Sequence, residues 1–262
     1  MTAPLLGCRD LSVRYGAARP ALDRVTLDLF PGEKLALIGE SGSGKTTLAR
    51  AVAGLLPEGS RVSGEIRWAG GPPRLGRDIG YVFQDPGGSL DPLVSVGAHL
   101  SEVLRAHISL SRAGASARAG ELLARVSVPA PEQALSAYPH QFSGGQRQRI
   151  AIALAIAAGP KLLIADEPSS SLDVLVQAEI VSLLRRLCDD GGMTLLFVTH
   201  DMALAGSLAD RLAVLKDGRL VEAGPARRVL ETPREPYTRG LLAAHIDLAS
   251  PRLVHGPAAV RP

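Results

Sequence analysis

The sequence predicts an α/β fold with an antiparallel β region and a helical insert, and three observations lead to this prediction. Short apolar runs typical of buried strands occur at 35–38, 79–83, 162–165 and 194–199. Loops and segments with helical spacing separate these runs, which is the order of elements in α/β domains. Between 93 and 140 the apolar residues keep a helical spacing almost throughout, which indicates an insert made of helices.

The composition is that of a globular protein and disfavours several other classes. Hydrophobic residues make up 46% of the 262 residues and charged residues 21%, which predicts a soluble chain with a substantial core. The net charge of +3 is too small, and the arginines too scattered, to indicate a nucleic-acid partner. Cys8 and Cys188 lie far apart, so we expect reduced, packed thiols in the cytosol and neither a disulfide framework nor a zinc site. No signal peptide is expected, and the longest apolar stretch, 150–158, is shorter than the about 20 residues that span a bilayer.

The antiparallel β region is predicted by two segments near the start of the chain, 5–15 and 25–30, in which apolar residues alternate. Pro31 and Gly32 then turn the chain into the apolar run 35–38. A β region therefore precedes the first buried strand.

The segment 39–46 matches the phosphate-binding loop pattern G-x-x-x-x-G-K-[ST] at every fixed position. It lies between the apolar run 35–38 and an expected helix at 46–53, which is the strand–loop–helix context that the motif requires. The backbone N–H groups of such a loop and of the helix N-terminus bind polyphosphate. Lys45 is expected to reach the β- and γ-phosphates, and the Thr46 hydroxyl to ligate Mg²⁺. The predicted nucleotide contacts here are Gly39, Glu40, Ser41, Gly42, Ser43, Gly44, Lys45, Thr46 and Thr47.

Tyr15 ends the first β segment just before a turn, where its ring could stack on an adenine. The position agrees equally well with a half-exposed aromatic side chain that contacts no ligand. From spacing alone, both interpretations stay open.

Gln84, Asp166, Glu167 and His200 come directly after three of the predicted buried strands. In α/β folds, ligands bind at the carboxyl ends of the strands. Because side chains alternate in direction along a strand, one of the two adjacent carboxylates can face a metal ion and the other the attacking water. A lone histidine is usually structural, but the place of His200 beside a nucleotide site favours a functional role.

Ser143 and Gln146 form a capping-box pattern at the start of an alanine-rich helix. Gly144 and Gly145 leave the N–H groups of the first turn exposed, so this helix start is a second predicted anion site. A simple helix cap is the alternative. A second glycine-rich anion site in a nucleotide-binding chain favours the functional interpretation.

Because these motifs occur together and in order, the chain resembles the ATPase subunits of ABC transporters along nearly all of its length. Tyr15 then falls where the family's adenine-stacking aromatic residue lies. The matched motifs are the Walker A loop at 39–46, the Q-loop at Gln84, the ABC signature at 143–146, the Walker B pair at Asp166 and Glu167, the D-loop at 171–173 and the switch histidine at His200.

The resemblance also implies a role for each site residue. Thr46, Gln84 and Asp166 would hold Mg²⁺, Glu167 would activate the attacking water, and His200 would contact the γ-phosphate. Two such subunits would sandwich two ATP molecules between one chain's phosphate loop and the other's signature helix. The signature and D-loop contacts to ATP would come from Ser143, Gly144, Gly145, Gln146 and Asp173.

Within this family, several segments make the chain similar to the peptide/nickel importer subgroup. Phe142 stands where leucine is commoner in the signature, a replacement that this subgroup tolerates, and Glu235 stands where histidine is common. Its length suits the nickel or metallophore branch somewhat better than the oligopeptide branch. The similar segments are 82–86, 89–92, 138–145 and 236–242.

The resemblance implies the ATP-hydrolysing motor subunit of an importer for peptides, nickel or a metal chelate, at the cytoplasmic face of the cell membrane. The implied partners are a second ATPase subunit, which is a copy or a paralogue, two membrane-spanning permease subunits and, indirectly, an extracytoplasmic solute-binding protein. The alternative is a soluble ABC ATPase that serves as an accessory subunit of a non-transport complex. The expected domains are an ATPase core with a β subdomain at 1–92 and 141–240, a helical subdomain at 93–140 and a C-terminal tail at 241–262.

Overall fold

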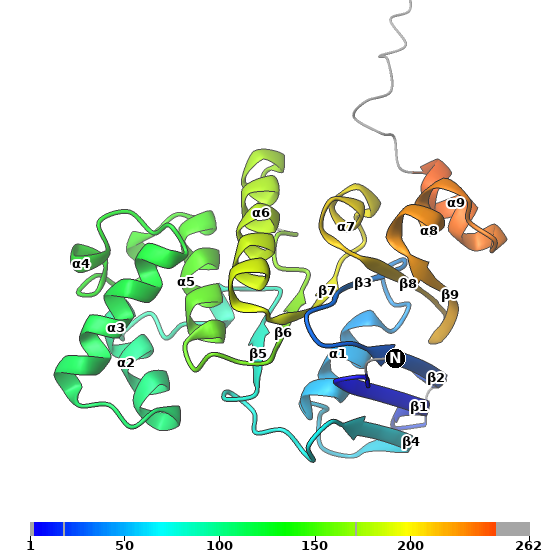
Figure 1. The fold of residues 1–262 in the computed structure, drawn as a ribbon, viewed down its shortest axis with the longest axis horizontal. Coiled ribbons are helices and arrows are strands. Elements are labelled where there is room, and N and C mark those ends of the chain that lie inside the picture. Colours follow the sequence, from blue (N-terminus) through cyan, green and yellow to red (C-terminus); the bar gives the residue numbers. More distant parts are fainter. Residues whose placement is uncertain (1–2, 18, 171, 245–262) are drawn as a thin grey trace, which may run out of the picture.

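The computed structural model describes residues 3–17, 19–170 and 172–244 of the chain. Within them, six strands form a sheet in the order β5-β6-β7-β3-β8-β9 (Figure 1). Its neighbouring strands are parallel, except that β8 and β9 are antiparallel. The strands are β3 (Lys34–Ile38), β5 (Ile79–Val82), β6 (Leu162–Asp166), β7 (Thr194–Val198), β8 (Arg211–Lys216) and β9 (Arg219–Pro225).

The central strands of this sheet are buried on both faces, which explains their continuous apolar sequences. In β3, Leu35, Ala36, Leu37 and Ile38 are all 0% exposed. Because β5, β6, β7 and β3 run in parallel, their carboxyl ends meet at one edge of the sheet. The residues that follow these strands are thereby brought together.

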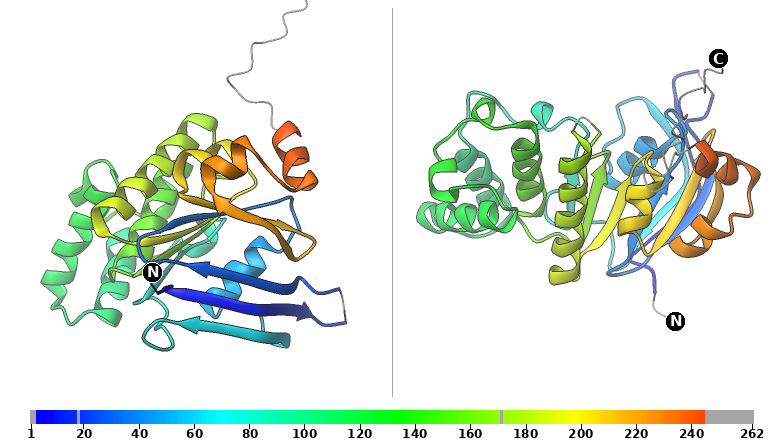
Figure 2. Two further views of the ribbon diagram at one scale, coloured as in Figure 1. Left: turned by 45° about the vertical axis from the view of Figure 1, so that its right-hand side comes forward. Right: turned by 90° about the horizontal axis from the view of Figure 1, so that it is seen from above.

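A smaller antiparallel sheet confirms the β region expected at the start of the chain. Its strands are β2 (Leu22–Leu29), β1 (Leu6–Tyr15) and β4 (Ser60–Trp68), in the order β2-β1-β4. Helix α1 (Lys45–Ala53) lies between the two sheets (Figure 2). Leu48 of α1 shares one apolar cluster with Leu22 of the small sheet and Leu37 of the large one.

The helical insert forms one end of the molecule (Figures 1 and 2). In α2, Val96, Leu100 and Leu104 are all 0% exposed, and their spacing of four residues places them on one face of the helix. Ser95 and Ser111 cap helices α2 and α3 by accepting hydrogen bonds from Ala98 N and Gly114 N. The elements that begin within 93–140 are α2 (Val96–His107), α3 (Arg112–Arg125), α4 (Pro131–Ala134) and η2 (Pro139–Gln141); η1 (Gly87–Ser89) precedes them and α5 (Gly144–Ile156) follows them.

Four helices follow in the described part of the second half, and two of them were not expected from the sequence. They are α6 (Val174–Gly191), α7 (Met202–Leu208), α8 (Ala226–Glu231) and α9 (Pro236–Ala244), of which α7 and α9 are the unexpected ones. The expected start of the tail at residue 241 falls inside α9, because the helix continues to Ala244. The rest of that tail, 245–262, and Ser171 of the D-loop lie outside the described residues. Among the residues described, no helix is both long and apolar enough to cross a bilayer.

Candidate nucleotide-binding site

The phosphate loop connects the end of β3 to the start of α1, as the motif predicts. Its glycines are required by the backbone. Gly44 has φ +104°, and an added Cβ there would lie 2.5 Å from the carbonyl oxygen of Ala21. The Ser43 carbonyl accepts a 3.0 Å bond from Gly218 N, so the turn between β8 and β9 holds the loop from outside.

Lys45 is folded back onto its own loop in this structure. Its Nζ donates to the carbonyl oxygens of Gly39 at 2.8 Å and Glu40 at 2.9 Å, and it lies 3.9 Å from Glu167 Oε1. The side chain is 4% exposed. Burial lowers the pKa of the Lys45 ammonium, and the carboxylates of Glu167 and Asp166 oppose that shift. The ammonium is therefore held beside the loop by groups that a phosphate could replace.

Asp166 is a buried carboxylate that accepts one hydrogen bond on each oxygen. Thr46 Oγ1 donates to Oδ1 at 3.0 Å, and the Tyr81 hydroxyl donates to Oδ2 at 2.8 Å. Burial raises the pKa of Asp166, although these two hydrogen bonds oppose that effect. Sequence reasoning missed Tyr81. The feature of the sequence that could have indicated it is a hydroxyl-bearing residue within the otherwise apolar run 79–83.

Glu167 lies beside Gln84 and His200, as their positions at strand ends predict. Gln84 Nε2 donates to Glu167 Oε2 at 3.2 Å, and His200 Nδ1 lies 3.6 Å from the same oxygen. Glu167 has φ +45°, which places a non-glycine residue in the left-handed region. Such backbone strain is concentrated at functional sites. The two adjacent carboxylates contact different side chains, Asp166 those of Thr46 and Tyr81 and Glu167 those of Gln84, Lys45 and His200.

Lys45, Gln84 and Glu167 line a hollow of about 220 Å³ at the sheet edge, together with the phosphate loop. A second hollow of about 360 Å³ adjoins it through Thr46 and Gln84, and Arg50 and Asp166 contribute to its wall. The arrangement combines a cation, backbone N–H groups and oxygen ligands in one place. The first hollow is lined by Ala21, Ser41, Gly42, Gly44, Lys45, Thr46, Thr47, Gln84 and Glu167.

Tyr15 borders this site, since its hydroxyl donates to Thr47 Oγ1 at 3.2 Å. Its ring thus lies next to the helix start that the phosphate loop forms. No aromatic ring contact is recorded for it among the described residues. The adenine-stacking role of Tyr15 stays a prediction.

The signature residues lie elsewhere, at the start of α5, and they line neither hollow. The predicted capping box is present, because Ser143 Oγ accepts from Gln146 N at 3.3 Å and Gln146 Oε1 accepts from Ser143 N at 2.9 Å. An added Cβ at Gly145 would lie 2.7 Å from Val176 in α6. Asp173 caps that helix by accepting from Val176 N at 3.0 Å. The signature and D-loop residues therefore form a second group, apart from Lys45.

The fold and the first group of residues define a class of protein. A glycine-rich loop after a central parallel strand, facing two carboxylates at a neighbouring strand end, is the arrangement of P-loop nucleotide-binding proteins. The sequence model of a family described as ABC transporter matches residues 22–170. The chain therefore belongs to the ABC transporter family.

Curated relatives match nearly the whole chain. It is 45% identical over 277 residues to the peptidoglycan transport ATP-binding protein YejF of Agrobacterium fabrum, which covers 97% of this chain and 51% of that protein. It is 42% identical over 261 residues to the oligopeptide transport ATP-binding protein OppD of Bacillus subtilis, covering 94% of this chain and 73% of OppD. The chain thus spans about half the length of the first relative.

A solved structure shares the fold as well. It is the dimeric, post-hydrolysis state of the ATP-binding cassette MJ0796 bound to ADP and Pi, with a TM-score of 0.72 and 28% identity. The match covers 85% of this chain and 99% of that one. The expected fold class, an α/β cassette of ABC type with an antiparallel sheet and added helices, is confirmed.

Proposed function

We propose that the chain is the ATP-hydrolysing motor subunit of an ABC importer. The observation that carries this proposal is the convergence of Lys45, Thr46, Asp166, Glu167 and Gln84 around two adjoining hollows at the carboxyl edge of the sheet. The two relatives above are named for oligopeptide and peptidoglycan transport, which favours a peptide cargo over nickel or a metal chelate. Membership of the family supports ATP as the substrate.

Hydrolysis in this site rests on positioning and charge stabilisation. Lys45 leaves the loop carbonyls for the β- and γ-phosphates of ATP. Glu167 orients the attacking water and accepts its proton, while His200 contacts the γ-phosphate. The water oxygen bonds to the γ-phosphorus as the bond to the β–γ bridging oxygen breaks, so ADP and phosphate are released. The signature residues and Asp173 of a second cassette, a copy or a paralogue, close over the ATP.

The site fits Mg²⁺ through its oxygen ligands. The Thr46 hydroxyl and the buried Asp166 carboxylate already lie 3.0 Å apart, and Gln84 borders the same hollow. No cluster of three histidine, cysteine or acidic residues occurs in the described part of the chain, so the cation would be held by few side chains and by ATP itself. Mg²⁺ is typically bound through one or two carboxylates plus substrate phosphates. When bound, it neutralises charge on the phosphate oxygens.

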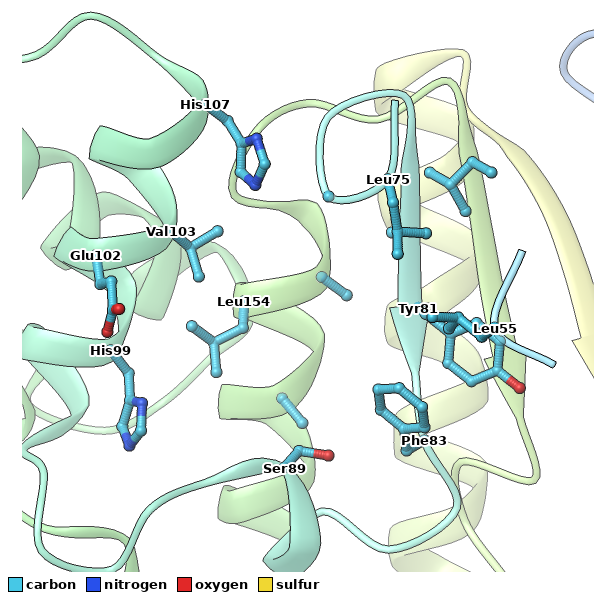
Figure 3. A pocket seen from close by; sticks show the side chains of 15 residues that line it. Leu55, Leu75, Tyr81, Phe83, Ser89, His99, Glu102, Val103, His107 and Leu154 are labelled. Carbon is cyan, nitrogen blue, oxygen red and sulfur yellow. The ribbon is translucent and has the colours of Figure 1, made fainter. Parts of the chain in front are cut away.

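A groove between the helical insert and the large sheet would receive the permease. It has a volume of about 340 Å³ and lies between α2, α5 and β5 (Figure 3). Val103 of α2, Leu154 of α5 and Phe83 all line it, and Phe83 is 40% exposed. We propose that a short helix of a permease subunit, with an apolar face, occupies this groove. Gln84 follows Phe83 directly, so the groove adjoins the nucleotide site.

The test is co-purification of the tagged full-length chain from detergent-solubilised membranes of its own source. We expect two polytopic subunits and a second cassette, with ATPase activity that Lys45→Ala abolishes. Val103→Asp should release the polytopic subunits, whereas Val62→Asp, at an exposed position on β4, should not. Recovery with soluble enzyme subunits alone would support the accessory-subunit alternative instead. The same proposal implies that the chain is attached peripherally to the cytoplasmic face of the membrane. It also implies that transport depends on a solute-binding protein that the chain does not contact directly.

A further inference from the structure

The peptide unit that joins Gly39 to Glu40 is held from both sides. Its carbonyl oxygen accepts a 2.8 Å bond from Lys45 Nζ, and its N–H donates a 3.2 Å bond to the hydroxyl oxygen of Tyr237. An added Cβ at Gly39 would collide with the Leu215 carbonyl oxygen, so the backbone packs closely here. The first peptide of the phosphate loop is thus oriented by a residue of α9, near the other end of the described chain.

Tyr237 is itself fixed by its surroundings. Lys216 Nζ, at the end of β8, lies over the ring at 4.8 Å from its centroid. The ring packs against the main apolar core. Thr238, the next residue of α9, is 0% exposed. Helix α9, packed against the core, therefore holds the Tyr237 hydroxyl next to the phosphate loop.

A buried carboxylate anchors the segment that leads into α9. Glu222 of β9 has a side chain that is 4% exposed. Its Oε1 accepts from Arg234 N at 3.1 Å, and its Oε2 accepts from Glu235 N at 3.2 Å. Burial alone would raise the pKa of Glu222, but the hydrogen bonds and Arg228 outweigh it and lower the pKa. The start of α9 is consequently tied to the strand beside β8.

We propose that Tyr237 is a positioning residue of the phosphate loop, through which helix α9 sets the affinity for ATP. The inference rests on the proposed function only in that ATP is the ligand. When Lys45 turns to the phosphates, the Gly39 carbonyl loses its donor, and the bond to Tyr237 still orients the same peptide. The loop then keeps its shape for phosphate binding without reorganising.

The test compares Tyr237→Phe with the unmodified full-length chain. The variant keeps the ring over Lys216 and removes only the hydroxyl. We expect the Kd for MgATP, measured by titration calorimetry, to rise about two- to tenfold, which is the range of one neutral hydrogen bond. The KM should rise by the same factor while kcat stays within about twofold, because loop positioning contributes to uniform binding. Gly240→Ala is the matched control on α9, since an added Cβ there meets nothing within 4 Å.

The outcomes separate this inference from the proposed function. Equal Kd values for Tyr237→Phe and the unmodified chain would overturn the positioning role and leave the ATPase proposal intact. A fall in kcat with unchanged Kd would overturn it as well. Failure of the unmodified chain to bind ATP would overturn both proposals. A raised Kd in Tyr237→Phe and not in Gly240→Ala would support the positioning role.

Discussion

The hydroxyl of Tyr81 donates a 2.8 Å hydrogen bond to Oδ2 of Asp166. The ring of the same tyrosine lines the groove proposed for the permease and lies 4.5 Å, between centroids, from the ring of Phe83. Figure 3 shows the Tyr81 hydroxyl pointing away from α2, toward the sheet side of the groove. One side chain thus contacts both the groove and the buried carboxylate of the nucleotide site.

Tyr81→Phe should destabilise the nucleotide-free protein. The change leaves Asp166 Oδ2 buried without its donor, which costs about 1–3 kcal/mol of unfolding free energy. Urea unfolding measures this cost. A double-mutant cycle with Asp166→Asn should give a coupling energy of at least about 0.5 kcal/mol, because the two groups are in contact. Additive effects of the two changes would show that the hydrogen bond contributes nothing.

Asp166→Asn should weaken binding of MgATP and change how the stability of the nucleotide-free protein depends on pH. Since the pKa of Asp166 is raised in the folded state, the folded protein binds a proton more readily than the unfolded chain. The unmodified protein therefore gains stability as the pH falls through that raised pKa. Asparagine has no carboxyl group to titrate, so the unfolding free energy of the variant, measured by urea unfolding, should gain less than that of the unmodified protein as the pH is lowered from neutral. An unfolding free energy that changes with pH equally in the two proteins would contradict this reasoning.

Tyr15→Ala should weaken ATP binding more than Tyr15→Trp. If the ring stacks on adenine, the stacking contributes about 0.5–1.5 kcal/mol to the free energy of ATP binding beyond the burial of apolar area. This corresponds to about two- to tenfold in Kd. Tyr15→Phe serves as the control for the hydroxyl, which donates to Thr47. Equal Kd values for the alanine and tryptophan variants would make Tyr15 a structural residue.

The sequence predicted those parts of the site that lie within short motifs. The pattern 39–46 contains its own strand, loop and helix signals, and the strand ends before Gln84, Asp166 and His200 follow from apolar runs. Parallel pairing then brings these strand ends to one edge, which explains why the predicted residues meet. The roles of these residues in catalysis stay predictions.

The contacts of Tyr81 and Tyr237 could not be predicted, because they depend on residues distant in sequence. Tyr81 lies 85 positions from Asp166, and Tyr237 lies 197 positions from Glu40. Periodicity describes only which face of an element is buried. Which tyrosine meets which backbone group depends on how β5, β8 and α9 pack.

Two helices were missed although local signals for them exist. Asp201 caps α7 by accepting from Ala203 N and Leu204 N, and aspartate is a preferred N-cap residue. Pro236 is the first residue of α9, a position that proline favours. Both helices are short, and the apolar periodicity of seven or nine residues is too brief to be decisive.

The assignment of Glu167 as the group that activates water is the central claim of the mechanism. Glu167→Gln keeps the shape of the side chain and can retain a hydrogen bond to Gln84, but it removes the negative charge. ATP should therefore bind with unchanged Kd, while hydrolysis slows by about 10²-fold or more, the usual contribution of a positioned base.

Single-turnover hydrolysis of bound ATP tests this claim most directly, because it isolates the chemical step from product release. The measurement is made on the unmodified protein and on Glu167→Gln, with the partner cassette present and ATP binding confirmed for both. We predict a fall of about 10²-fold or more in the single-turnover rate constant of the variant. Hydrolysis by Glu167→Gln at the rate of the unmodified protein would contradict it.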